Sequence, residues 1–161
     1  MSVDAQLFRS ALGHFASGVT VVTVRHLGEN AGFTATAFSS VSLQPPLILI
    51  CVDQNASSRA ILDEAGHFAV NVLSAEQESI SRTFASRGVD RFADLNYNLG
   101  QLEDPLIARA LVQLECKVVQ KVVAGDHTVY FGEVQNAHVQ DGTPLLHFQG
   151  KYRQLTPKIN G

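Results

Sequence analysis

The last third of the chain limits the possible folds most, because it predicts long strands and almost no helix. Apolar residues at alternating positions over 110–118 are separated by mostly polar ones, which is the period of a half-buried strand. Residues 124–127, Ala-Gly-Asp-His, then predict a turn, and residues 128–139 predict a second long strand. We therefore expect a hairpin here, with residues 144–155 completing the fold.

Shorter elements precede this hairpin. Apolar and β-branched runs predict strands at 19–24, 47–53 and 67–73, and a strand or a strand with a bend at 34–43. Helices are predicted from Leu7 to about residue 17, over 55–66 with a stop at Gly66, and from the capping-box pair Ser74 and Gln77 to about residue 86. Residues 88–105 predict a loop. Six or seven strands without strict strand–helix alternation predict a mainly β antiparallel barrel or sandwich.

The composition limits the class of protein. With 161 residues, 45% of them hydrophobic, the chain is long enough to bury a core, and we expect residues 1–161 to form one domain. A net charge of −3 and the lack of Lys or Arg runs argue against nucleic-acid binding. The longest apolar run is too short to cross a bilayer, and no cationic segment suggests export. We expect a cytoplasmic protein with Cys51 and Cys116 as buried free thiols.

Several common catalytic motifs are missing from the sequence. Residues 13–20 come close to a phosphate-binding P-loop, but Val19 stands in place of the lysine and the helix precedes the strand. No Gly-x-Gly-x-x-Gly follows a strand, and no Gly-x-Ser-x-Gly occurs. The six histidines show no ligand-like spacing, so we expect no metal site.

Residues 32–46, GFTATAFSSVSLQPP, carry five Ser or Thr residues and no charge. By itself this segment fits an edge strand whose hydroxyl groups face water. Gly32 and the small residues Ala35 and Ala37 would also let backbone groups approach a flat ligand. An uncharged surface of this kind is suited to a heterocycle with hydrogen-bonding edges.

A second polar group follows the next predicted strand. Asn55, Ser57 and Ser58 lie at a predicted helix start, where free backbone N–H groups together with Arg59 form an anion site. A heterocycle on one loop and its phosphate on the next describe a flavin nucleotide.

Ordered motifs from Phe8 to Leu155 carry a resemblance to a known family. They are FASGVTVVT, GFTATAFSSVSLQPPLILICV, FAVNVLS, GDH and GKYRQL. The chain resembles the short-chain flavin reductases, NAD(P)H:flavin oxidoreductases with the Greek-key, FMN-binding split-barrel fold. Members of this family are reductase components of two-component flavin-dependent monooxygenases.

The resemblance implies which residues hold the flavin. The ring would lie against Thr34, Ala35, Thr36, Ala37, Ser39 and Ser40. The ribityl chain and phosphate would be held by Asp53, Gln54, Asn55, Ser57 and Ser58. Phe84 and Ala85 would lie on the phosphate side, where Arg87 or Arg91 would add positive charge, although Arg91 also fits a plain surface residue.

His127 and Tyr152 have alternative interpretations. A lone histidine at a hairpin turn is often a surface or capping residue, whereas the resemblance places His127 on the open side of the flavin, where nicotinamide stacks. There it would orient the substrate rather than make bonds. Asp126 either holds the imidazole or only makes the turn. Tyr152 packs at the flavin, at a dimer interface or in the core.

The implied activity is reduction of free or loosely bound FMN or FAD by NADH or NADPH. Hydride would pass from nicotinamide C4 to flavin N5, in a homodimer that supplies reduced flavin to a separate monooxygenase. The lack of a basic cluster for a 2′-phosphate favours NADH. Two alternatives stay open: a flavin-binding storage or sensor protein without turnover, and a flavin oxidase with its own organic substrate.

Overall fold

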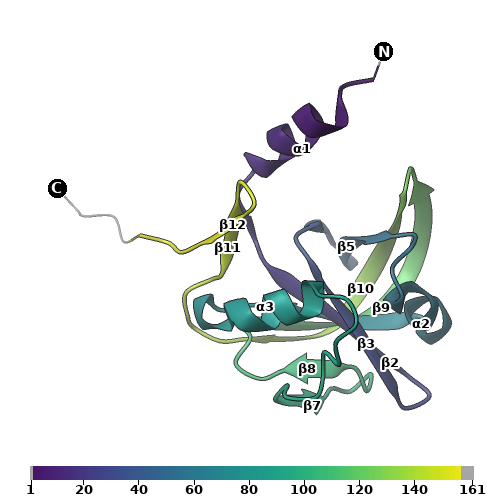
Figure 1. Ribbon diagram of the computed structural model, residues 1–161. Coiled ribbons are helices and arrows are strands. Elements are labelled where there is room, and N and C mark those ends of the chain that lie inside the picture. Colours follow the sequence, from purple (N-terminus) through teal and green to yellow (C-terminus); the bar gives the residue numbers. More distant parts are fainter. Residues whose placement is uncertain (1, 157–161) are drawn as a thin grey trace.

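The computed structural model describes residues 2–156. Its elements are α1 (Ala5–Gly13), β1 (Ser17–Gly18), β2 (Thr20–His26), β3 (Glu29–Ala35), β4 (Phe38–Leu43), β5 (Pro46–Asp53), α2 (Ser58–Ala65), β6 (His67–Val72), the 3₁₀ turn η1 (Ala75–Gln77), α3 (Glu78–Ala85), β7 (Tyr97–Leu99), β8 (Pro105–Ile107), β9 (Val112–Ala124), β10 (His127–Val139), β11 (Leu146–Phe148) and β12 (Lys151–Arg153). The chain is mainly β with short helices, as expected (Figure 1).

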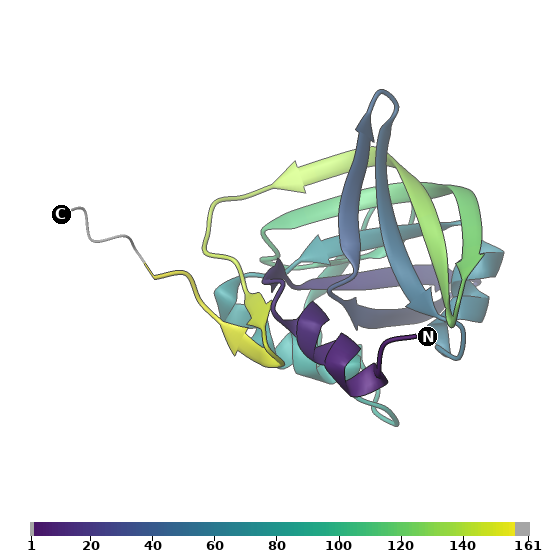
Figure 2. The ribbon, with the colours of Figure 1, turned by 90° about the horizontal axis from the view of Figure 1, so that it is seen from above.

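One antiparallel seven-stranded sheet dominates the fold, in the order β3-β2-β6-β9-β10-β5-β4. It curls into a barrel that is left open between its edge strands β3 and β4 (Figure 2). These two strands are consecutive in the chain, and only Thr36 and Ala37 lie between them. The opening of the barrel therefore falls at the uncharged segment, which belongs to both edges. Strands β1, β11 and β12 form a separate sheet, and β7 pairs with β8.

Strand β2 is buried on both faces because two apolar clusters meet at it. Val22 and Val24 pack in a cluster with Phe68 and Tyr130. Val21 instead belongs to a second cluster, which lies under α3. The β-branched run that predicted this strand therefore serves both cores. No helix in the described part of the chain is long and apolar enough to span a membrane.

The predicted hairpin is confirmed, with β9 and β10 paired along most of their length and a turn at Gly125 and Asp126. Gly66 ends α2 in the left-handed conformation, and the capping box of Ser74 and Gln77 is present. Cys51 and Cys116 are both free, but Cys51 is only half-buried.

Other boundaries were predicted incorrectly. Helix α1 ends at Gly13 rather than near residue 17. Over 34–43, by contrast, the structure agrees with the alternative of a strand with a bend, since Thr36 and Ala37 separate the end of β3 from β4. Strand β3 starts at Glu29, a segment with no predicted element. The segment predicted as the loop 88–105 contains β7 and the start of β8.

Gly32 serves packing rather than access for a ligand, which corrects the expectation from the sequence. A Cβ atom at this position would lie 2.7 Å from Cε1 of Phe84 and 2.7 Å from the carbonyl oxygen of Val22. The absence of a side chain lets β3 lie close to α3, so the close approach is to the protein itself.

We expect Gly32→Ala to lower the free energy of unfolding by about 1–3 kcal/mol, because the backbone carbonyl of Val22 cannot move aside as a side chain can. Urea denaturation measures this change. Gly18→Ala is the control, since a Cβ atom there meets nothing within 4 Å. Equal stability of the Gly32 variant and the control would contradict the packing account.

Candidate functional site

A cavity of about 710 Å³ lies at the open side of the barrel, a volume typical of small-molecule sites. Its walls come from the β3–β4 connection, the end of β5, the start of α2, the end of α3 with the following loop, and the start of β10. It gathers twelve of the residues expected at the flavin: Thr34, Ala35, Thr36, Ala37, Asp53, Asn55, Ser57, Ser58, Phe84, Ala85, Arg91 and His127. The two polar groups found in the sequence therefore share one cavity.

The uncharged wall, residues 34–37, is held in place by hydrogen bonds on both sides. The Thr34 hydroxyl donates to the carbonyl of Ser81 at 2.6 Å, which ties the wall to α3. The carbonyl of Ala35 accepts from the Thr20 hydroxyl at 2.6 Å, and that of Ala37 accepts from the Cys51 N–H at 3.2 Å. These three hydrogen bonds thus fix the backbone of the wall, and none of the side chains of residues 34–37 is charged.

A second wall, residues 53–58, presents backbone N–H groups. Asp53 shapes it, because its Oδ1 accepts from the Asn55 N–H at 2.7 Å and its carbonyl accepts from the Ala56 N–H at 3.0 Å. Within the described residues, the N–H groups of Ser57 and Ser58 have no hydrogen-bond partner. These groups lie at the N-terminus of α2, whose dipole favours an anion.

Two arginines line the cavity, Arg87 and Arg91. The Arg91 guanidinium donates through Nη1 to the carbonyl of Gly32 at 2.8 Å and through Nη2 to that of Ser86 at 2.6 Å. It therefore fastens the loop after α3 to β3 while adding positive charge to the cavity wall. Arg87 is exposed at the same wall.

His127 reaches the cavity from the hairpin turn. Its Nδ1 donates to Oδ1 of Asp126 at 2.7 Å, so the Asp126 carboxylate both belongs to the turn and holds the imidazole. The hydrogen bond and charge of His127 lower the pKa of Asp126. His127 also pairs across the sheet with Asp53, and its side chain is 44% exposed. The turn and the N–H wall are therefore direct neighbours.

Four of the expected residues do not line the cavity. Ser39 and Ser40 lie on β4 and are exposed, and the side chain of Gln54 points to the hairpin turn. Tyr152 packs against the second core cluster, with its hydroxyl 2.7 Å from that of Ser81. Of the alternatives for Tyr152, the described chain fits core packing.

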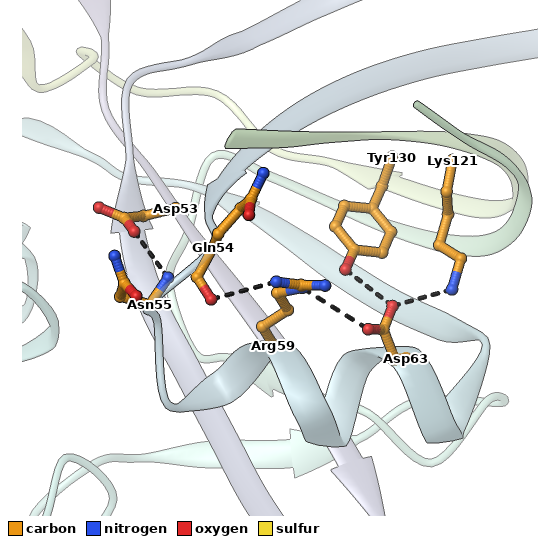
Figure 3. A network of polar contacts seen from close by, with 7 residues as sticks. All are labelled: Asp53, Gln54, Asn55, Arg59, Asp63, Lys121 and Tyr130. Carbon is orange, nitrogen blue, oxygen red and sulfur yellow. Dashed lines mark hydrogen bonds and ion pairs between the residues drawn. The ribbon is translucent and has the colours of Figure 1, made fainter. Parts of the chain in front are cut away.

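Arg59 also differs from its expected place. Its guanidinium donates to the carbonyl of Gln54 at 3.1 Å and lies 3.7 Å from a carboxylate oxygen of Asp63. Figure 3 shows both contacts, and Arg59 is not among the residues that line the cavity. The positive charge at this end therefore comes from the two arginines after α3.

Sequence reasoning missed several residues of the cavity: Phe33, Cys51, Val52, Ala56 and Gly88. Most are apolar positions on or beside strands, which in the sequence look like core residues. The one signal in the sequence that could have identified them is that they neighbour predicted site residues. Burial raises the pKa of the Cys51 thiol, so at neutral pH it lines the cavity as a neutral group.

Known proteins are similar to this chain in sequence along most of its length. Residues 12–156 match the flavin reductase like domain. The reductase component of 4-nitrophenol 4-monooxygenase/4-nitrocatechol 2-monooxygenase from Rhodococcus opacus is 38% identical over 158 residues, covering 98% of this chain and 85% of that protein. The FMN reductase (NADH) SmoA from Agrobacterium fabrum is 40% identical over 153 residues, covering 95% of this chain and 87% of that protein.

The solved structures agree. The NADH:FAD oxidoreductase SgcE6 of Streptomyces globisporus C-1027, in complex with NAD and FAD fragments, superposes with a TM-score of 0.93 at 40% identity, covering 99% of both chains. Neighbours of this kind are flavin reductases, so the expected split barrel and the expected enzyme class are both confirmed. With a match along nearly its whole length, this chain belongs to the flavin reductase family.

Proposed function

We propose that this protein uses NADH to reduce a flavin nucleotide, FMN or FAD, in the 710 Å³ cavity. One observation carries the proposal: the uncharged wall, residues 34–37, and the N–H groups of Ser57 and Ser58, which have no partner within the described residues, lie in the same cavity. A flavin phosphate fits the start of α2, with Arg87 and Arg91 supplying countercharge. The ring then lies along the uncharged wall.

The two nucleotides would supply the chemistry when bound: hydride would pass from nicotinamide C4 to flavin N5, giving NAD⁺ and reduced flavin. The protein supplies placement. The uncharged wall offers backbone groups to the polar edge of the ring and adds no competing charge. His127, held by Asp126, orients the nicotinamide on the open face. NADPH is the less favoured donor because the sequence contains no run of Lys or Arg that would bind a 2′-phosphate.

We expect His127→Ala to lower kcat/KM for NADH about tenfold, the equivalent of about 1.4 kcal/mol, while the flavin Kd changes less than twofold. Steady-state kinetics and flavin fluorescence titration measure the two quantities. His14→Ala is the matched control, because His14 lies beside Phe148, outside the cavity lining. Unchanged NADH parameters in the His127 variant would count against its role.

We also propose that the reduced flavin passes to a separate monooxygenase. Support comes from relatives whose names give them as reductase components of such systems. A cytoplasmic location and a single domain over residues 1–161 belong to the same proposal. The two free thiols are consistent with a reducing compartment.

A homodimer is proposed from the apolar face of α1. Helix α1 has no buried residue and projects from the body of the chain (Figure 1). Leu7 and Leu12 on α1 and Phe15 just after it are 61%, 58% and 81% exposed, and apolar side chains exposed together are typical of an interaction surface. A second copy of the chain is the partner that would cover it.

We expect the double change Leu12→Asp and Phe15→Asp to convert a dimer into a monomer, because each carboxylate would be desolvated in the interface. Light scattering after size-exclusion chromatography gives the mass. Arg9→Asp on the same helix is the control for added charge. A variant and a wild-type protein of the same mass would refute this interface.

A further inference from the structure

Gln54 belongs to the N–H wall of residues 53–58 but does not line the cavity, and it joins this wall to the hairpin turn. Its backbone N–H donates to the carbonyl of Asp126 at 3.0 Å, and its side-chain Nε2 donates to the carbonyl of Gly125 at 3.0 Å. Both acceptors belong to the turn that carries His127. The N–H wall is therefore fastened twice, through Gln54, to the turn that carries His127.

The other side of Gln54 is fastened to α2. Its carbonyl accepts from Nη1 of Arg59 at 3.1 Å, and Arg59 forms an ion pair with Asp63 one helical turn later. Figure 3 shows these groups in a row, running from Gln54 along α2. Arg59 thus holds the loop of residues 53–58 against its own helix.

Asp63 connects this row back to the hairpin. Its Oδ1 accepts from the Tyr130 hydroxyl at 2.8 Å and from Nζ of Lys121 at 3.0 Å (Figure 3). Tyr130 is fully buried and pairs with Lys121 across β10 and β9. Although burial raises the pKa of Asp63, these hydrogen bonds and the charges of Lys121 and Arg59 hold it below its usual value. Asp63 therefore stays ionised.

The contacts form a closed circuit from the turn through Gln54, Arg59 and Asp63 to the strands of the same hairpin. The Arg59–Asp63 ion pair lies within α2, and the other links are hydrogen bonds that join the loop and the helix to the hairpin, so a shift of the turn relative to α2 must break one of them. A displacement of about 1 Å between reacting groups lowers reaction rates strongly, on the order of a hundredfold. A circuit of this kind suits a site that must keep two bound nucleotides aligned.

We propose that Gln54 is a positioning residue for hydride transfer: its side chain fixes the His127 turn relative to the wall that binds the flavin phosphate. The proposal rests on the proposed function, since it assumes that His127 orients the nicotinamide. It differs from the expected role of Gln54 as a flavin contact, because the amide is used within the protein.

The test is a double-mutant cycle with Gln54→Met and His127→Ala. Methionine keeps the length of the side chain and the backbone bonds but removes the amide donor. We expect Gln54→Met alone to lower kcat/KM for NADH about fivefold, the scale of one lost hydrogen bond, with flavin Kd and thermal midpoint nearly unchanged. In the His127→Ala background the same change should have no further effect.

Gln113→Met is the matched control, because Gln113 is also half-buried and donates through Nε2 to a backbone carbonyl, that of Ile107, at 2.7 Å. It should leave the NADH parameters unchanged. A fivefold loss from Gln54→Met in both backgrounds, or an equal weakening of flavin binding, would overturn the positioning role alone. A His127→Ala variant as active as the wild type would overturn the proposed role of His127 and, with it, the role of Gln54.

Discussion

Replacing Ser57 with aspartate is expected to weaken FMN binding about a hundredfold, the equivalent of about 2.8 kcal/mol, and to leave the fold intact. Ser57 is the N-cap residue of α2 and lines the cavity. Ser57 makes no capping hydrogen bond, and the helix dipole favours a carboxylate at this end, so the helix itself should not lose stability. The carboxylate would, however, lie beside the bound phosphate, and two like charges about 4 Å apart repel by several kcal/mol at an effective dielectric constant of about 20.

The choice of ligand separates phosphate binding from ring binding. Riboflavin has the same ring and no phosphate, so its affinity should change less than twofold in the Ser57→Asp variant. Ser57→Asn is the neutral control and should keep most of the FMN affinity. Fluorescence titration of both ligands gives the comparison, and an equal loss for riboflavin and FMN would show that the phosphate does not lie at the start of α2.

Phe84→Ala is expected to cause the largest loss of stability, about 3–5 kcal/mol. Phe84 is only 1% exposed, packs in the second core cluster and makes an edge-to-face contact with Phe92 at a centroid distance of 5.2 Å. Truncation would leave a hole between α3 and β3 and loosen the cavity wall to which Phe84 also belongs. Because small domains are stable by only about 5–15 kcal/mol, we expect the variant to lie near its folding threshold at elevated temperature.

Urea denaturation at low temperature measures the loss for Phe84→Ala. Phe84→Leu keeps most of the apolar volume, so its loss of stability should be less than half of the loss in Phe84→Ala. A loss below about 1 kcal/mol for Phe84→Ala would mean that α3 is not anchored by this side chain.

The sequence predicted the fold best where one local rule acts on a long segment. The alternation over 110–118 and the turn at Gly125 were sufficient for the β9–β10 hairpin. The start of β3 was missed because its hairpin turn uses Leu27 and Gly28, both with positive φ, and leucine is an unusual residue there. Strands β7 and β8 have only three residues each, too few for a periodic pattern.

The first helix shows the limit of periodicity. The helical spacing of Leu7, Phe8, Ala11, Leu12 and Phe15 correctly predicted an amphipathic helix, but α1 ends at Gly13 and its apolar face is not covered within the described chain. A pattern of apolar residues says that a face should be buried and not which molecule buries it. The sequence therefore predicts the helix but not the molecule that covers it.

The site was predictable where residue type alone limits the chemistry. Uncharged residues 34–37 and the loop before α2 do meet in one cavity, as inferred from hydroxyl content and capping. The direction of a side chain could not be predicted. The side chain of Gln54 points to the hairpin turn, and that of Arg59 to the carbonyl of Gln54. Cys51 lines the cavity, although its strand has the apolar sequence of a core strand. Such choices depend on neighbours brought close by folding.

The most direct test of the central claim is an anaerobic assay of purified protein with NADH and excess FMN, or FAD in a parallel series, following nicotinamide and flavin absorbance together. The account predicts many turnovers per protein, with one NADH oxidised for each flavin reduced and a rate far above that of the protein-free mixture. Flavin binding without any NADH loss above that mixture would contradict it and identify the cavity as a storage or sensor site.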